Sequence, residues 1–175
     1  MANIFVISDT HFNHENILKF LRVDGARVRP FDNVKQMDDL MVQNWNETVR
    51  VQDHVYHLGD VAMKRGPEVE AILSSLNGHL RLVRGNHDIF RTKWYLQWFA
   101  EIYGVRVLSN LLFSHIPIHR ESLGRFAANV HGHVHEKPSP NGPYINVSVE
   151  NTHYKPMALD DLVQQAKRLK FELAI

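Results

Sequence analysis

Short apolar runs without a polar interruption recur along the chain, and each ends at a polar or glycine-containing turn. Runs of this length that are rich in β-branched residues are typical of strands buried on both faces of a sheet. Two of the later runs flank Ser109-Asn110, a dipeptide that favours a hairpin turn. The expected strands are 4–7, 54–58, 80–83, 105–108, 111–113, 128–130 and 144–149.

Other segments carry an apolar residue at every third or fourth position, which predicts helices that bury one face. Asp32 or Asn33 can cap the first helix, and Pro67 suits the first turn of the second. A third, aromatic-rich segment is expected to be helical, and its aromatic side chains are expected to belong to the core. The expected helices are 34–49, 67–76, 94–103 and 160–170.

Composition narrows the class of protein. The chain has 175 residues, of which 44% are apolar, and shows no repeat or linker, so we expect a single domain over 1–175. A net charge of +1 gives no indication of a nucleic-acid or membrane partner. The absence of cysteine excludes zinc–thiolate sites, disulfides and a cysteine nucleophile. No signal peptide or membrane anchor is recognised, and a cytoplasmic location is expected.

The most informative polar residues directly follow the apolar runs. The chain has twelve histidines, and several of them occur with acidic residues or asparagine in short segments at the ends of expected strands. In an open α/β sheet, ligands bind beyond the carboxyl ends of the strands, so one crevice can collect these side chains. The segments contribute Asp9 and His11, Asp60, Asn86, His115, and His133 and His135.

Carboxylate oxygens combined with imidazoles suit Mn²⁺, Fe or Zn²⁺, which activate water. Asp60 follows a glycine that permits a tight turn, and it is the natural bridge between two ions. Asn86 adds a neutral amide oxygen and so limits the negative charge. We therefore expect a site for two divalent ions, with Mn²⁺ favoured and Fe, Zn²⁺ or Ni²⁺ as alternatives.

These segments occur in the order D-x-H, G-D, G-N-H-D, H and G-H-x-H, from Ser8 to His135. In this respect the chain resembles the calcineurin-like metallophosphoesterase superfamily, and the segment S-D-T-H-F-N-H-E-N-I at 8–17 resembles its small bacterial and phage branch. The resemblance implies a four-layer α/β/β/α sandwich of two mixed sheets. It assigns Asp9, His11, Asp60 and His135 to one metal ion, and Asp60, Asn86, His115 and His133 to the other.

The resemblance also implies a reaction. Two metal ions would activate water for in-line attack on phosphorus, and His87 would protonate the departing oxygen. The implied substrate is a small phosphodiester, with a cyclic nucleotide or a nucleic-acid end as examples. The alternatives are a phosphomonoesterase acting on a nucleotide or small metabolite, and a non-catalytic binding scaffold.

One departure from the superfamily is informative. The protein phosphatase branch has an aspartate that orients the acid histidine, and Met63 occupies that position here. This argues against a protein phosphatase and leaves Asp88 as a candidate partner for His87. Three further residues, Arg29, Arg84 and His119, are candidate substrate contacts. For Arg29 a solvated loop is the more common outcome, and for Arg84 a structural ion pair is an equal alternative.

Overall fold

A computed structural model describes residues 2–172 and contains two mixed β-sheets. The first sheet has the order β4-β3-β2-β1-β9. Strands β1 to β4 pair in parallel, and β9 pairs antiparallel with β1. Its strands are β1 (Ile4–Ile7), β2 (His54–His57), β3 (His79–Val83), β4 (Phe99–Tyr103) and β9 (Met157–Ala158).

The second sheet has the order β5-β6-β7-β8, and β5 is its antiparallel edge strand. The β5–β6 hairpin turns at Ser109 and Asn110, whose φ angles of 49° and 63° are those of a tight turn that matches strand twist. The expected hairpin is thus confirmed. The strands are β5 (Arg106–Leu108), β6 (Leu111–Phe113), β7 (Ala128–His131) and β8 (Tyr144–Asn146).

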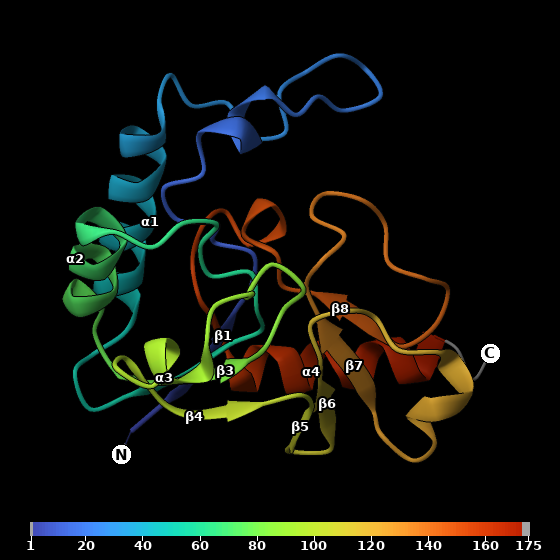
Figure 1. Ribbon diagram of the computed structural model, residues 1–175. Coiled ribbons are helices and arrows are strands. Elements are labelled where there is room, and N and C mark those ends of the chain that lie inside the picture. The colour runs from blue at the N-terminus through green and yellow to red at the C-terminus, as the bar shows by residue number, and fades with distance from the viewer. Residues whose placement is uncertain (1, 173–175) are drawn as a thin grey trace.

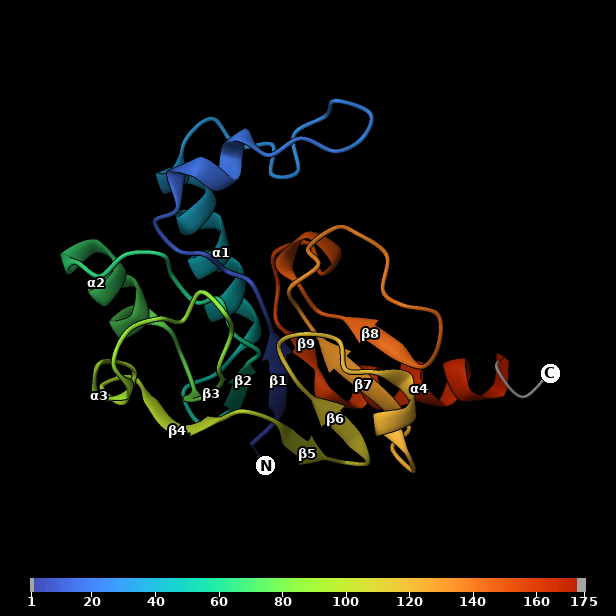
Figure 2. The same ribbon diagram turned by 45° about the vertical axis from the view of Figure 1, so that its right-hand side comes forward.

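Two helices cover the outer face of the first sheet (Figures 1 and 2), namely α1 (Val34–Thr48) and α2 (Pro67–Ser75). The N-terminus of α1 is capped by Asn33, whose side chain accepts a hydrogen bond from the Gln36 N–H at 2.9 Å. Trp45 of α1 lies in the core between this helix layer and the sheet. Within residues 2–172, no helix is long and apolar enough to cross a membrane.

The two sheets face each other across a second apolar core. Val6 and Val83 from the first sheet meet Phe113 and Val130 from the second. The C-terminal helix α4 (Leu159–Glu172) inserts Leu162 into the same core. The chain is therefore an α/β sandwich with two mixed sheets, as expected.

The outer face of the second sheet differs from the expected helical fourth layer. It is covered by the segment around the one-turn helix η2 (Arg120–Leu123), where Leu123 packs on Leu112 and Tyr144. The long helix α4 follows β9 directly, and β9 lies at the edge of the first sheet. This starting point places α4 against the core between the sheets instead of outside the second sheet.

The prediction of a helix over 94–103 was wrong. The structure has a short helix α3 (Thr92–Tyr95) and then the parallel edge strand β4, which pairs with β3. Phe99 is buried by this pairing, so the strand gains backbone hydrogen bonds and apolar contact together. The aromatic residues are core residues as predicted, since Trp94, Tyr95 and Phe99 are all buried.

Candidate metal centre

The predicted ligands lie in turns that follow the strands, and most of them have an unusual backbone. The φ angles of Asp9, His11, Asp60, His133 and His135 are 58°, 48°, 58°, 70° and 54°. Positive φ is uncommon for residues other than glycine and carries a cost in free energy. Such conformations cluster at functional sites because the surrounding structure holds them there. The backbone thus marks five of the seven predicted ligands, and the exceptions are Asn86 and His115.

Two glycines allow these turns to approach each other closely. A Cβ on Gly132 would lie 2.2 Å from an Asp9 carboxylate oxygen and 2.0 Å from the Ser8 hydroxyl. A Cβ on Gly85 would lie 2.3 Å from an Asp60 carboxylate oxygen. Both distances are far below van der Waals contact. Glycine is therefore required at each position for the carboxylates to remain where they are.

The first group of ligand atoms contains Asp9, His11 and His135, whose atoms lie within 4.8 Å of one another. The Nε2 atom of His11 is 3.9 Å from an Asp9 oxygen and 3.6 Å from an Asp60 oxygen. Asp9 is fully buried and accepts hydrogen bonds from the His133 N–H and the Ser148 hydroxyl. The carboxylates of Asp9 and Asp60 therefore both lie within 4 Å of the His11 Nε2 atom.

The second group contains Asp9, Asp60 and His115, also within 4.8 Å. Asn86 joins it, because its Oδ1 lies 2.9 Å from both His115 Nε2 and His133 Nδ1. The Nδ1 of His115 donates to the Leu58 carbonyl at 2.8 Å, so Nε2 is the nitrogen directed at the group. The seven side chains, here called the ligand cluster, are Asp9, His11, Asp60, Asn86, His115, His133 and His135.

Two members of the ligand cluster, His11 and Asp60, have the charge states that suit ligands of a divalent cation. Both ring nitrogens of His11 are buried without a hydrogen-bond partner. Burial and the charge of Arg29 hold the pKa of His11 well below its ordinary value, so the ring is neutral and can act as a ligand. Burial opposes ionisation of Asp60, but the His115 side chain outweighs it and lowers the pKa of Asp60 to about 2. Neutral imidazole beside ionised carboxylate is the donor set that such cations take.

Behind the ligand cluster lies a buried ion pair that the sequence did not reveal. The carboxylate of Glu150 accepts from Arg29 at 2.7 Å and from His135 Nδ1 at 2.9 Å. The His135 Nε2 atom therefore faces Asp9, 4.0 Å away. Burial opposes ionisation of Glu150, but Arg29 and His135 together lower its pKa to about 2. A carboxylate that fixes the tautomer and orientation of a ligand histidine is a common supporting element in metal sites.

Arg29 was predicted as a candidate substrate contact, and its position corrects that prediction. Its side chain is 0% exposed. Besides Glu150, the guanidinium donates to the backbone carbonyls of Asp9 at 2.6 Å and Thr10 at 2.9 Å. Arg29 thus binds the backbone beside one ligand and, through Glu150, the ring of another. No surface remains on it for a phosphate.

Arg84 also has a structural role. Its guanidinium donates to the carbonyls of Asp88, at 2.7 Å, and Phe90, and it lies over the Tyr95 ring. These bonds fix the loop that carries Asn86 and His87. Of the two readings that the sequence left open for Arg84, the structure therefore supports the structural one.

Asp88 does not orient His87. Its carboxylate accepts from the backbone N–H groups of Asp60, Val61 and Gly85 at 2.9, 3.0 and 2.8 Å. It ties two ligand-bearing loops together and makes no hydrogen bond to the imidazole of His87. Asp88, which the sequence suggested as the partner of His87, thus binds backbone N–H groups instead.

His87 itself is exposed at the edge of the ligand cluster. Its backbone N–H donates to an Asp60 carboxylate oxygen at 2.8 Å, and its ring centroid is 5.7 Å from that of His11. The third candidate substrate contact, His119, is exposed at the start of η2. His131 is fully buried and its Nδ1 donates to the carbonyl of Gly132, so it packs behind the cluster.

No protein-family model matches the chain. The chain is 37% identical over 179 residues to Uncharacterized protein MJ1445 of Methanocaldococcus jannaschii, covering 97% of this chain and 94% of that protein. The chain belongs to the MJ1445 family. It also matches the Gene 66 protein of Mycobacterium phage L5, at 28% identity over 91 residues, which is 50% of this chain and 41% of that protein.

Among solved structures, the protein of unknown function AQ665 from Aquifex aeolicus superposes with a TM-score of 0.70. It is 27% identical, and the superposition covers 94% of this chain and 99% of that one. The names of these relatives state no activity. The superposition on AQ665 therefore supports the overall architecture, while the reaction has to be inferred from the site.

Proposed function

We propose that this MJ1445-family chain is a metal-dependent phosphoesterase of the calcineurin-like superfamily, and that it hydrolyses phosphodiesters. The observation that carries the proposal is the ligand cluster. Seven side chains from loops after β1, β2, β3, β6 and β7 meet at one place, in the order and with the residue types of that superfamily.

Two bound divalent ions, with Mn²⁺ favoured, would supply activated water and stabilise the charge that develops on phosphorus. The residues that would hold them are those of the ligand cluster, with Asp60 shared. The chain's own contribution is to keep these donors fixed before substrate arrives. Asp88 ties the loops of Asp60 and Gly85 together, and Arg29 with Glu150 joins the segments of Asp9 and His135.

In this proposal, His87 has the role of the acid that protonates the leaving oxygen. Its ring lies at the exposed edge of the cluster, while its backbone is tied to Asp60. An exposed imidazole can reach a substrate bound at the cluster and exchange its proton with solvent. It thus combines a fixed backbone with an accessible ring, as a general acid requires.

A diester is favoured over a monoester because cavities open on two sides of the ligand cluster. One cavity, of about 510 Å³, is lined by His133 and His135. The other, of about 350 Å³, is lined by Asn86 and His115. A phosphodiester bound at the cluster carries two organic groups, and each cavity can receive one of them.

The test is hydrolysis of bis-p-nitrophenyl phosphate by metal-stripped protein, with and without Mn²⁺. We expect turnover that requires Mn²⁺ and that Asp60→Ala lacks, together with a lower metal content in that variant. His87→Ala should keep its metal and lose activity mainly on esters with poor leaving groups, whereas His79→Ala, an exposed histidine on β3, serves as the control. Turnover of p-nitrophenyl phosphate alone would identify a monoesterase, and turnover of neither would refute the proposal.

A further inference from the structure

The chain carries uncovered apolar surface beside the ligand cluster. Residues 19–28, here called the arm, form a loop that projects from the body of the protein (Figure 1). Phe20 and Leu21 on the arm are 51% and 61% exposed. Apolar side chains held in the open next to a candidate catalytic site are typical of a surface that contacts a ligand.

The arm is an ordered structure held at its base. The Val28 N–H donates to the Phe20 carbonyl at 2.9 Å, and Leu21 forms an antiparallel bridge with Arg27. The next residue after the arm is Arg29, which is bound to the backbone beside the ligands. The apolar side chains of the arm are therefore held at a fixed position relative to the ligand cluster.

Between the arm and the loop after β7 lies the cavity of about 510 Å³, here called the arm pocket. Its apolar wall is formed by Phe20, Leu21, Val28 and Val134. At the near end are the ligands His133 and His135, and at the rim are Lys19, Lys137 and Glu136. The pocket thus combines an aromatic ring and aliphatic surface with charged groups that can bond to a polar ligand.

The Phe20 ring is linked to the ligand cluster by a short series of aromatic contacts. Its centroid is 6.5 Å from that of His14, with the rings perpendicular. His14 in turn lies 5.5 Å from His11. A flat group that stacks on Phe20 is therefore within reach of a phosphate bound at the cluster.

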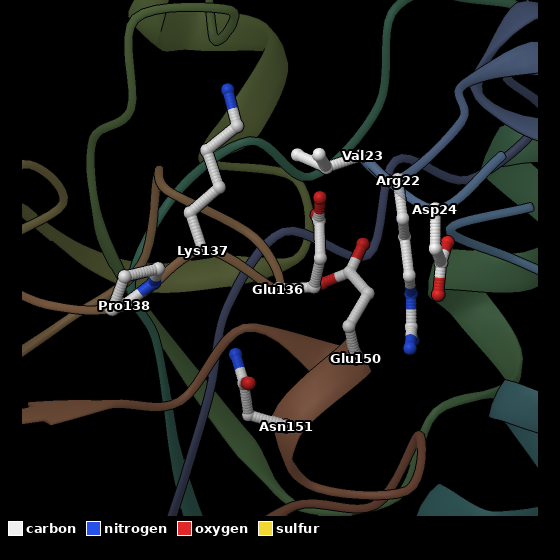
Figure 3. Close-up of a pocket in the computed structure, with 8 residues that line it drawn as sticks. All are labelled: Arg22, Val23, Asp24, Glu136, Lys137, Pro138, Glu150 and Asn151. Carbon is white, nitrogen blue, oxygen red and sulfur yellow. The ribbon is translucent and has the colours of Figure 1, made fainter. Parts of the chain in front are cut away.

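The arm pocket continues outward into a second cavity, which shares Glu136 and Lys137 with it. Figure 3 shows Arg22, Val23 and Asp24 of the arm in this outer cavity, together with the loop residues Glu136 to Pro138. Cationic and acidic side chains are mixed here, which does not suit a long polyanion. It does suit a ligand with neutral hydrogen-bonding groups beyond its phosphate.

We propose that the arm pocket binds a nucleoside that is esterified to the phosphate held at the ligand cluster. The base stacks on Phe20, while Glu136 and the two lysines bond to the polar groups of the sugar and base. This assignment rests on the proposed phosphodiesterase function and adds a substrate class to it. Stacking of a base on an exposed aromatic side chain is a general mode of nucleotide recognition.

The test compares three chromogenic diesters in the presence of Mn²⁺: the p-nitrophenyl esters of thymidine 5′-phosphate, of phenyl phosphate and of methyl phosphate. We expect Phe20→Ala to reduce kcat/KM for the thymidine ester by about tenfold, in line with base-stacking measurements. The methyl ester should change by less than about twofold. Leu96→Ala, which removes an exposed apolar side chain elsewhere, is the matched control.

A second measurement does not depend on hydrolysis. Thymidine 5′-monophosphate added to isotopically labelled protein should shift the ring resonances of Phe20 and the methyl resonances of Leu21 and Val28. Methyl phosphate should leave them unchanged. If the wild-type protein cleaves none of the esters, the proposed function fails. The resonance shifts then show by themselves whether the arm pocket binds a nucleoside.

Several results would overturn the assignment. One is an equal loss on all three esters, or no loss, in Phe20→Ala. Another is a phenyl ester that depends on Phe20 as strongly as the thymidine ester does, since the pocket would then select apolar groups in general. A third is a stable dimer that Phe20→Ala dissociates, because a second copy of the chain would then cover the arm.

Discussion

At the scale of single residues, the site is built from groups that are costly to bury. The oxygens of Asp9 and Asp60 lie within 4.8 Å of each other, with both side chains almost fully buried. Two carboxylates this close repel each other, and His11 between them has no hydrogen-bond partner. A bound cation would offset the burial of the two carboxylates, their mutual repulsion and the missing partner of His11 together. The unfavourable features of these residues are therefore the strongest structural support for a metal site.

Glu150 gives the first prediction at this scale. Glu150→Gln removes the charge that orients His135 and neutralises Arg29, so we expect the affinity for Mn²⁺ to fall by about tenfold. Calorimetric titration of the metal-stripped protein measures the change. Glu136→Gln, on the neighbouring loop, is the control and should keep its affinity. An unchanged affinity in Glu150→Gln would show that the ion pair serves stability alone.

Gly132 gives the second prediction at the scale of single residues. Alanine there places a Cβ 2.2 Å from an Asp9 oxygen, so the turn or the carboxylate has to move. We expect a loss in free energy of unfolding of about 1–3 kcal/mol and weakened metal binding. Gly104→Ala is the control, because its Cβ would meet nothing within 4 Å. Chemical denaturation of both variants measures the free energy of unfolding, and the two values are compared when both variants unfold with the same m value.

At the scale of elements, helix α1 is connected to the ligand-bearing loop after β1. The Asp38 carboxylate on the inner face of the helix accepts from the Asn13 N–H at 3.0 Å, two residues beyond His11. Asp38 is buried, and its other carboxylate oxygen has no hydrogen-bond partner. The contact therefore fixes the loop, whereas the burial of Asp38 makes the charged form of its carboxyl group unfavourable.

The burial of Asp38 predicts that the stability of the protein depends on pH. Burial raises the pKa of Asp38 from 3.8 to about 7, so the folded protein keeps a proton that the unfolded chain loses. The stability that this group contributes is fully present below about pH 4 and is lost as the pH rises through 7. Asp38→Asn should remove that loss, so its stability relative to wild type should grow with pH over this range.

Denaturation at several pH values between 4 and 8 measures the difference, which should grow by at most about 1.4 kcal/mol per pH unit. Asp39→Asn, on the exposed side of the same helix, should show no such trend. A difference between Asp38→Asn and wild type that stays constant across the range would contradict the pKa assigned to Asp38.

The elements also show what the sequence was able to predict. The early strands were predicted because their buried residues form uninterrupted apolar runs, and the helices α1 and α2 because their apolar residues repeat with a helical period. Strand β4 was missed because its aromatic residues fit a helical spacing as well, and only pairing with β3 decides between the two. The Arg29–Glu150 pair was missed because it joins residues 121 positions apart, and no local pattern encodes such a contact.

At the scale of the whole molecule, the candidate metal centre joins the two sheets. Asp9 and Asp60 follow strands of the first sheet, while His115 and His133 follow strands of the second. The Ser8–Ser148 bridge connects the sheets beside the ligands. A cation bound here therefore links both halves of the sandwich, and its binding free energy contributes to the stability of the whole fold.

Metal removal should accordingly lower stability. Free Mn²⁺ at 100 times its dissociation constant adds about 2.7 kcal/mol per site to the free energy of unfolding. We expect a higher Tm on adding Mn²⁺ to the stripped protein, and a much smaller rise in Asp60→Ala. Calorimetric scans at several metal concentrations measure the effect. An equal rise in both proteins would place the stabilising ion elsewhere.

The position of β9 has a consequence for biosynthesis. This strand is made after the entire second sheet, yet it pairs with β1 at the edge of the first. Glu150, which orients His135, is also made only shortly before it. A chain emerging from the ribosome can therefore assemble its early strands but cannot complete the metal centre until nearly all of it has been translated. A product truncated before Glu150 would lack both the edge strand β9 and the carboxylate that orients His135.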